Sequence, residues 1–208
     1  MRAPDTGPGR AATGLPRAVW AAFAVALTLA ASACASSPWE RAVTTWSRTE
    51  RAYVNFETRA ILHASLRSAP FRAAWVDAYA QAFALTPTQR DQLAAVEAEA
   101  AAGRVTVLAG FYTAEPRWNS LNPADGLWEV RLETDRGDLA HPVAVRRLDT
   151  SNPVWATLLP WLDPFSVLYE LQFEAATLGP GDHDRLERPL SLVIAGAAAR
   201  LRVTWQTP

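Results

Sequence analysis

The sequence has no lysine and only one cysteine, and each shortage excludes a kind of chemistry. All twenty basic residues are arginine, so Schiff bases, P-loop lysines and serine–lysine dyads, which need a side-chain amine, are excluded. A single cysteine forms no disulfide within the chain and no cysteine-clustered metal site. We therefore expect stability to come from core packing, and we expect no metal and no cofactor.

The chain also lacks an excess of charge of either sign. Its formal net charge is −1, which gives none of the basic footprint that nucleic-acid binding requires. With 208 residues, half of them hydrophobic, it can form one well-packed domain or two small domains that share an interface. Nine tryptophans are many for this length, and large aromatic side chains contribute strongly to cores and interfaces.

The amino-terminal end has the pattern of a secretory signal peptide over residues 1–33. Arg2, Arg10 and Arg17 precede an apolar or small stretch, residues 18–33, that ends in Ala-Ser-Ala. This order of basic, apolar and small residues is typical of signal peptides. The sixteen-residue stretch is shorter than the roughly 18–20 residues that cross a bilayer comfortably. The A-x-A pattern by itself predicts cleavage to a secreted soluble protein.

The only cysteine, Cys34, follows this cleavage pattern directly. Residues 31–34, Ala-Ser-Ala-Cys, resemble the lipobox of bacterial lipoproteins, with alanine where that family usually has leucine. The resemblance covers residues 1–34 and implies cleavage before Cys34, a diacylglycerol on its sulfur and acylation of the new amine. Two or three acyl chains anchor a protein stably in a membrane. Because Ala35 rather than Asp follows, the resemblance implies the outer membrane, on the side that faces the periplasm.

A helical segment is predicted over residues 34–103. Ser37, Pro38 and Glu40 form a capping-box pattern, and a polar stripe after it predicts a helix from Pro38 to near Arg67. A second helix is predicted over 71–85 and a third over 86–102, with glycine at the next position as a stop signal.

The third predicted helix begins with the run LTPTQ, residues 85–89. Besides a helix start, this run resembles the LTxxQ motif of a family of periplasmic helical chaperones that shield unfolded chains. The match is limited to Leu85, Thr86 and Gln89 and occurs once. It implies an alternative function, that of a chaperone-like holder.

After residue 103 the hydrophobic period changes from 3.6 to 2, which predicts β-structure over residues 104–208. Alternating stretches with one polar face predict antiparallel strands. Six strands are expected, over residues 104–112, 127–134, 142–148, 166–174, 189–195 and 199–205. The predicted fold class is therefore α+β: about three helices, then a small antiparallel β-sandwich that is immunoglobulin-like, with a partly open barrel as the alternative.

The candidate catalytic and metal-binding residues are few. His63 lies on a predicted helix and His141 precedes a proline, while His183 lies between Asp182 and Asp184. Carboxylates beside an imidazole can orient it or bind a cation, but the neighbouring glycines predict a turn, where Asp usually bonds its own backbone. The common catalytic and phosphate-binding motifs do not occur. We expect no enzyme; a hydrolase with an unrecognised site stays open, because paired carboxylates meet only in space.

Three tryptophans in long proline-containing connections are the candidate binding residues: Trp118, Trp155 and Trp161. Tryptophan is favoured at the centres of protein interfaces, and ordered loops often carry binding surfaces. The alternative is that these rings close the open ends of the core. The sequence thus predicts a non-enzymatic protein of the cell envelope that is held to the membrane through Cys34 and binds an envelope protein.

Overall fold

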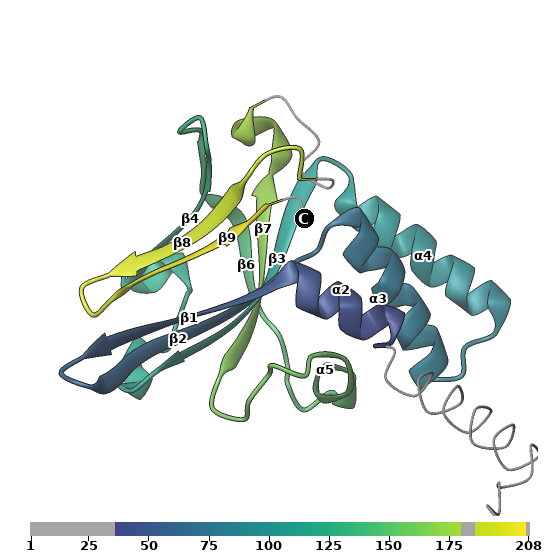
Figure 1. The fold of residues 1–208 in the computed structure, drawn as a ribbon, viewed down its shortest axis with the longest axis horizontal. Helices are drawn as coiled ribbons and strands as arrows, with labels where there is room; N and C mark the ends of the chain where they lie inside the picture. Colours follow the sequence, from purple (N-terminus) through teal and green to yellow (C-terminus); the bar gives the residue numbers. More distant parts are fainter. Residues whose placement is uncertain (1–35, 180–185, 207–208) are drawn as a thin grey trace, which may run out of the picture. The chain divides into compact units, whose positions relative to one another are not determined.

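The computed structural model describes residues 36–179 and 186–206. Contacts divide the chain into two compact units, Met1–Ser36 and Ser37–Pro208, and all described helices and strands lie in the second (Figure 1). Their order is α2 (Pro38–Trp46), β1 (Ser47–Val54), β2 (Glu57–Leu66), α3 (Ala69–Ala82), α4 (Pro87–Ala101), β3 (Arg104–Thr113), the short 3₁₀ helices η2 (Pro116–Trp118) and η3 (Pro123–Asp125), β4 (Trp128–Thr134), β5 (Leu139–Ala140), β6 (Pro142–Arg147), α5 (Pro153–Leu158), β7 (Val167–Glu174), η4 (Ala175–Leu178), β8 (Leu190–Gly196) and β9 (Arg200–Trp205).

The described strands form two antiparallel sheets. Sheet A has five strands in the order β1-β2-β3-β7-β6, and sheet B has four in the order β5-β4-β8-β9. The edge strands β1 and β9 lie side by side: Arg48 Nε donates a hydrogen bond to the Thr204 carbonyl at 3.2 Å, and Trp205 Nε1 donates to the Trp46 carbonyl at 2.7 Å. The first bond joins the two sheets along one edge, and the second joins β9 to the end of α2.

Sheet A lies between sheet B and a layer of helices. Phe111, on one face of β3, meets Trp128 of sheet B edge-on with ring centroids 5.2 Å apart. Gly110, on the opposite face of β3, lies under the ring of Trp161. Since successive side chains of a strand point to opposite faces, β3 is buried on both sides. Its near-continuous hydrophobic run follows from this central position.

The helices are started by side-chain caps that the sequence predicts. Ser37 caps α2 in a capping box with Glu40, and Thr86 caps α4 in the same way with Gln89. Figure 1 shows α2, α3 and α4 gathered at the same end of sheet A. The helical layer joins the core mainly through α3, whose Phe71 is fully buried.

The helix predicted from Pro38 to near Arg67 is wrong beyond Trp46. Residues 47–66 instead form the β1–β2 hairpin, which pairs from Ser47↔Ser65 to Val54↔Glu57. Four alternate residues of β2 are almost completely buried: Ala60, Leu62, Ala64 and Leu66. Their period of two matches a strand that packs between β1 and β3, and burial on one face of a sheet outweighs the helix propensity of alanine and leucine.

The remaining predicted elements are confirmed. The helices expected over 71–85 and 86–102 correspond to α3 and α4, and the six expected strands correspond to β3, β4, β6, β7, β8 and β9. The short β5 and α5 were not predicted. Because β2 pairs with β3, strands from the predicted helical segment and from the predicted sandwich share one sheet. The α+β class with two antiparallel sheets is confirmed.

Candidate functional site

The turn of the β1–β2 hairpin has a strained backbone. The strands pair as far as Val54↔Glu57, so the loop is Asn55-Phe56, and both residues have positive φ, 50° and 66°. Two such residues define a type I′ turn, which joins hairpin strands with the correct twist and usually has Asn-Gly or Asp-Gly. Asn55 fits this turn. Phe56 stands where glycine is favoured, and a bulky side chain with this φ costs free energy.

At and beside the same turn lie three exposed hydrophobic residues, here called the tip patch: Tyr53, Val54 and Phe56. Phe56 is 103% exposed, Tyr53 58% and Val54 42%. A register shift between Ala52 and Tyr53 forms an irregularity of the kind that redirects side chains in a strand. The tip patch therefore combines backbone strain with apolar side chains that make no contribution to the core, and this combination is typical of sites kept for binding.

Two rigid elements connect the tip patch to the first described residues. α2 passes into β1 without a loop, since Trp46 ends the helix and Ser47 begins the strand. The Arg48 guanidinium stabilises this junction, because it donates hydrogen bonds to the carbonyls of Thr45 and Ser47 at 2.9 and 2.8 Å. Figure 1 shows the start of α2 and the β1–β2 turn at opposite ends of this run.

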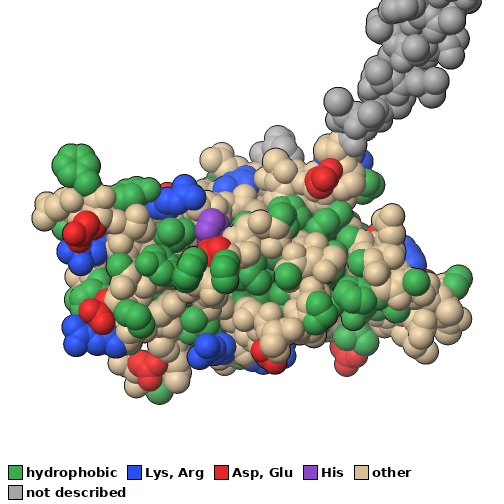
Figure 2. All heavy atoms as spheres, turned by 90° about the horizontal axis from the view of Figure 1, so that it is seen from below, with side chains coloured by type: hydrophobic (Ala, Val, Ile, Leu, Met, Phe, Trp, Pro, Cys, Tyr) green, Lys and Arg blue, Asp and Glu red, His purple; other side chains and the backbone are tan. Residues whose placement is uncertain are grey.

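Hydrophobic side chains are also exposed outside the tip patch. Figure 2, which views the structure from below, shows hydrophobic side chains spread over this face among Arg, Asp and Glu. Phe165, in the loop before β7, is 75% exposed. Such scattered exposure is ordinary for a protein surface, whereas the tip patch adds the strained turn.

The three tryptophans predicted to bind a partner do not form one surface. Trp155 packs on Trp75 of α3 with ring centroids 5.7 Å apart, and Trp161 donates from Nε1 to Ser65 Oγ at 3.0 Å. Trp118 lies elsewhere, where its carbonyl accepts a hydrogen bond from Trp128 Nε1 at 2.7 Å. All three are partly buried against the core. This packing fits the alternative that the rings cover core residues, and binding of a partner by any of the three stays a prediction.

A polar cluster lies under Trp161 on the outer face of sheet A. The His63 ring stacks on Trp161 with a centroid distance of 5.9 Å, and its Nδ1 is 2.8 Å from Thr49 Oγ1. Burial lowers the pKa of His63 below its usual value, the charge of Asp163 opposes this shift, and that of Arg51 reinforces it.

This cluster brings together an imidazole and a hydroxyl group, a pair that can exchange a proton. The Asp163 carboxylate, however, accepts hydrogen bonds from the Phe165 and Ser166 amides and from Ser166 Oγ, at 2.8, 3.0 and 2.7 Å. Asp163 thus holds its own loop, and the cluster has the contacts of a structural site. The sequence placed His63 on a helix and so missed this arrangement.

A second group of buried charges joins the helices to sheet A. Arg67 Nη2 lies 2.6 Å from Glu97 Oε1 of α4, and Arg67 Nη1 lies 3.4 Å from Glu170 Oε2 of β7. Arg72 of α3 also reaches Glu97, at 3.3 Å. Arg67, Arg72 and Glu170 have side chains less than 10% exposed. Each carboxylate is shared by two arginines, since Arg146 contacts Glu170 at 3.1 Å.

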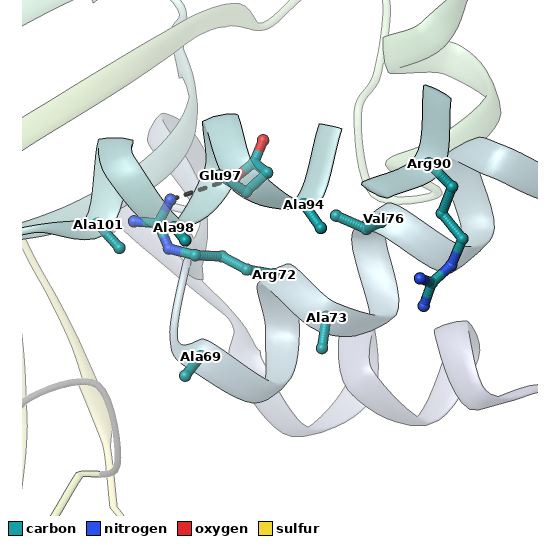
Figure 3. A pocket seen from close by; sticks show the side chains of 9 residues that line it. All are labelled: Ala69, Arg72, Ala73, Val76, Arg90, Ala94, Glu97, Ala98 and Ala101. Carbon is teal, nitrogen blue, oxygen red and sulfur yellow. Dashed lines mark hydrogen bonds and ion pairs between the residues drawn. The ribbon is translucent and has the colours of Figure 1, made fainter. Parts of the chain in front are cut away.

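Above these charges lies a hollow of about 420 Å³ between α3 and α4. Figure 3 shows its alanine side chains on both helices and the bond between Arg72 and Glu97. Helix α4, described in full, contributes no buried residue. The ion pairs with Glu97 are therefore a main attachment of α4, and the hollow is the shallow space between two helices that small residues line.

Several predicted features lie outside the described residues: the signal peptide, Cys34, and the turn with Asp182, His183 and Asp184. His141 is described and is exposed before β6. Among the described residues, no group of three or more His, Cys, Asp or Glu side chains is placed to hold a metal ion. None of the described helices has the length and apolar composition needed to cross a membrane.

Comparison with known proteins adds no family to this picture. No protein-family model, no curated protein and no solved structure matches the chain.

Proposed function

We propose that this protein is a lipid-anchored, non-enzymatic adaptor of the cell envelope that binds a protein partner through the tip patch. The membrane part of the proposal rests on the lipobox-like residues 31–34 and places the lipid on Cys34. The binding part rests on one observation: Phe56 is fully exposed although its backbone is strained. Folding alone favours glycine and a polar surface there, so a binding role accounts for both features.

The distance between the two ends of the α2–β1 run suits an adaptor. Cys34 precedes Ser37 by three residues, which span at most about 10 Å of chain. The nine residues of α2 add about 13 Å, and the eight of β1 add about 26 Å. An anchored protein can thus hold the tip patch clear of the bilayer. The anchor also raises the effective concentration of the protein toward other membrane-bound proteins.

The charges near the tip patch favour a protein partner over a second membrane. Arg51 lies on β1 and Glu57 and Arg59 lie on β2, close to it in the hairpin, and Arg59 pairs with Glu57 at 3.7 Å. Charges of both signs around an apolar centre are typical of protein interfaces. Binding to an anionic membrane surface instead needs a cluster of basic residues.

Photo-crosslinking in intact cells tests the binding proposal. A photoreactive phenylalanine analogue replaces Phe56, and the control carries it at Leu139, which is 51% exposed on β5 of sheet B. We expect a discrete crosslinked protein from position 56 and none from position 139. Equal labelling from both positions, or none from position 56, would contradict the proposal.

The location is tested separately by fractionation. We propose the outer membrane, periplasmic side, because Ala35 follows Cys34. The wild-type protein is expected in the outer-membrane fraction after a carbonate wash, and Cys34→Ala is expected in the soluble fraction. A variant that stays membrane-bound would show that something other than Cys34 holds the protein.

The immunoglobulin-like arrangement is likewise proposed only for sheet B. Its order β4-β8-β9 resembles the C-F-G sheet of that fold, in which the last two strands form a hairpin beside an earlier strand. The meander β1-β2-β3 in sheet A has no counterpart there. An experimental structure that separated β4 from β8 would remove this resemblance.

A further inference from the structure

The outer edge of β1 carries backbone groups that no strand of the described chain pairs. Arg67, which follows β2, donates from its amide to the Thr106 carbonyl of β3 at 2.9 Å. Because the bonding direction alternates along an antiparallel strand, odd-numbered residues of β2 bond to β3 and even-numbered residues bond to β1. These even-numbered residues pair with even-numbered residues of β1 as far as Ala52. The amide and carbonyl groups of Thr49 and Arg51 therefore point away from β2.

The outer edge of β9 has the same property. At the turn of the β8–β9 hairpin, the Gly196 amide donates to the Ala199 carbonyl at 3.0 Å. In this register the even-numbered residues of β8 lie opposite the odd-numbered residues of β9, and these residues bond to one another. The amide and carbonyl groups of Arg200 and Arg202 therefore point away from β8.

These two edges face each other, and we call residues 49–51 and 200–202 along them the β1–β9 seam. The seam is closed at one end, where Arg48 Nε bonds the Thr204 carbonyl. From that end the β1–β2 and β8–β9 hairpins diverge toward their tips (Figure 1). Among the described residues, no backbone hydrogen bond joins β1 to β9. Unpaired strand edges of this kind are templates for pairing with another chain.

The side chains that flank the seam on the outer faces of both sheets are arginines. On β9, buried residues alternate with Arg200 and Arg202, which therefore point outward. On β1, Arg51 shares the outer face of sheet A with His63, and Glu50 lies on the opposite face. Within the part of the chain that the structure describes, neither Arg51 nor Arg200 has an ion-pair partner. Charges of one sign at an edge disfavour strands of the same sign and favour strands of the opposite sign.

We propose that the β1–β9 seam binds an extended segment of the partner protein in which acidic side chains alternate with uncharged ones. The backbone of this segment pairs with Thr49 and Arg51, and its acidic side chains lie beside the outward arginines. Tyr53 and Val54 of the tip patch follow on the same strand, so the seam and the tip patch form one continuous surface. The inference rests on the proposed function and adds the kind of segment that the partner presents.

Binding of a synthetic peptide tests this chemistry without knowledge of the partner. The probe is a capped, fluorescent peptide that alternates glutamate with threonine and valine. One control peptide has lysine in place of glutamate, and the other is N-methylated at its central residues and so loses backbone hydrogen bonds. Fluorescence anisotropy is measured with the full chain purified from cells, at physiological ionic strength. We expect the acidic probe to bind and each control peptide to bind about tenfold more weakly or less.

A pair of proline variants tests the edge itself. Arg51→Pro removes an amide from the outer edge of β1. Arg147→Pro makes the same change on β6, the other edge strand of sheet A, where the neighbouring Leu148 amide bonds the Leu168 carbonyl at 2.8 Å and the Arg147 amide points away from β7. Proline is tolerated at such edge positions. We expect Arg51→Pro to weaken binding of the acidic probe about tenfold or more and Arg147→Pro to leave it unchanged.

Four results would overturn the inference: no binding of the acidic probe, equal binding of the lysine peptide, equal binding of the N-methylated peptide, or full affinity in Arg51→Pro. Thermal unfolding checks that the variants are folded, and the N-methylated peptide replaces Arg51→Pro if that variant is not. Sedimentation velocity of the free protein tests a different occupant. A dimer that Arg51→Pro abolishes would assign the edge to a second copy of the chain and also overturn the inference.

The crosslink from position 56 separates this inference from the proposed function. In cells we expect that crosslink to be lost in Arg51→Pro and kept in Arg147→Pro. A crosslink kept in both would leave binding by the tip patch in place and contradict only the strand pairing. If position 56 gives no crosslink without either proline variant, the proposed function fails, and the peptide measurements still decide whether the seam binds an acidic strand.

Discussion

Trp161 lies over Gly110 so closely that no other residue fits beneath it. A Cβ atom on Gly110 would lie 2.8 Å from Cζ3 of the indole ring, closer than atoms in a packed protein approach. The same ring stacks on His63 with an angle of 15° between the planes. The side chain of Trp161, from a loop distant in sequence, packs directly on the backbone of β3, and this contact explains why position 110 of a central strand is glycine.

Gly110→Ala is expected to lower the free energy of unfolding by about 2 kcal/mol, because the added methyl group forces Trp161 off the sheet. The Trp161→Phe variant lacks the Cζ3 edge of the indole. In that variant, Gly110→Ala should therefore lower the free energy of unfolding by clearly less than it does in the wild type. Urea unfolding of the four proteins gives the coupling between the two sites. Equal costs in both backgrounds would show that the contact with Trp161 is not the cause.

Protonation of His63 should destabilise the fold. Burial lowers its pKa in the folded protein, while in the unfolded chain it is about 6.5. The unfolded chain therefore takes up a proton first as the pH falls, and unfolding is favoured. This contribution to stability is complete above pH 6.5 and is lost as the pH falls toward the folded pKa. Urea unfolding is measured at pH 7.5 and at pH 5.5. Between these pH values the free energy of unfolding should fall less for His63→Asn than for the wild type. An equal fall in both proteins would contradict this prediction.

Phe56→Gly is expected to stabilise the protein by about 1 kcal/mol and to abolish partner binding. Glycine relieves the left-handed strain at φ 66° and removes the exposed ring. Phe56→Ala is the matched control, because it also removes the ring but keeps a Cβ atom in the strained conformation. Urea unfolding and co-precipitation with the crosslinked partner measure the two effects. If both variants bind normally, the tip patch is not the binding site.

Glu97→Ala should lower the free energy of unfolding by about 3 kcal/mol, because it leaves the guanidinium groups of Arg67 and Arg72 buried without this carboxylate. Glu99→Ala, on the exposed side of the same helix, should change it by less than about 0.5 kcal/mol. Urea unfolding compares the two variants. A similar small effect for both would mean that the ion pairs do not hold α4 to the sheet.

The sequence predicts the helices and strands whose signals are local. Thr86 and Gln89 form a capping box that the structure contains, and the alternation in β7 is visible without knowledge of its partners. The β1–β2 hairpin lacks such a signal, because Phe56 stands where a glycine would mark the turn. Burial of β2 between β1 and β3 depends on long-range pairing that a local pattern does not contain.

The candidate site is less accessible to sequence reasoning than the fold. Residue type and loop position predict a binding role for Trp155, which the structure shows packed against the core, and that role stays a prediction. Phe56 lies within the helix that the sequence predicts, and that prediction indicates neither its exposure nor its positive φ. Residues 57–66 alternate, but the polar run of residues 47–51 shows no matching alternation, so the turn that exposes Phe56 has no local signal in the sequence.

The mass of the native protein extracted from its membranes tests the central claim, that the chain is anchored through Cys34. The account predicts a chain that begins at Cys34 and carries the added mass of a diacylglyceryl group, with or without a further acyl chain on the amine. A chain cleaved elsewhere, or one with an unmodified thiol at position 34, would contradict it.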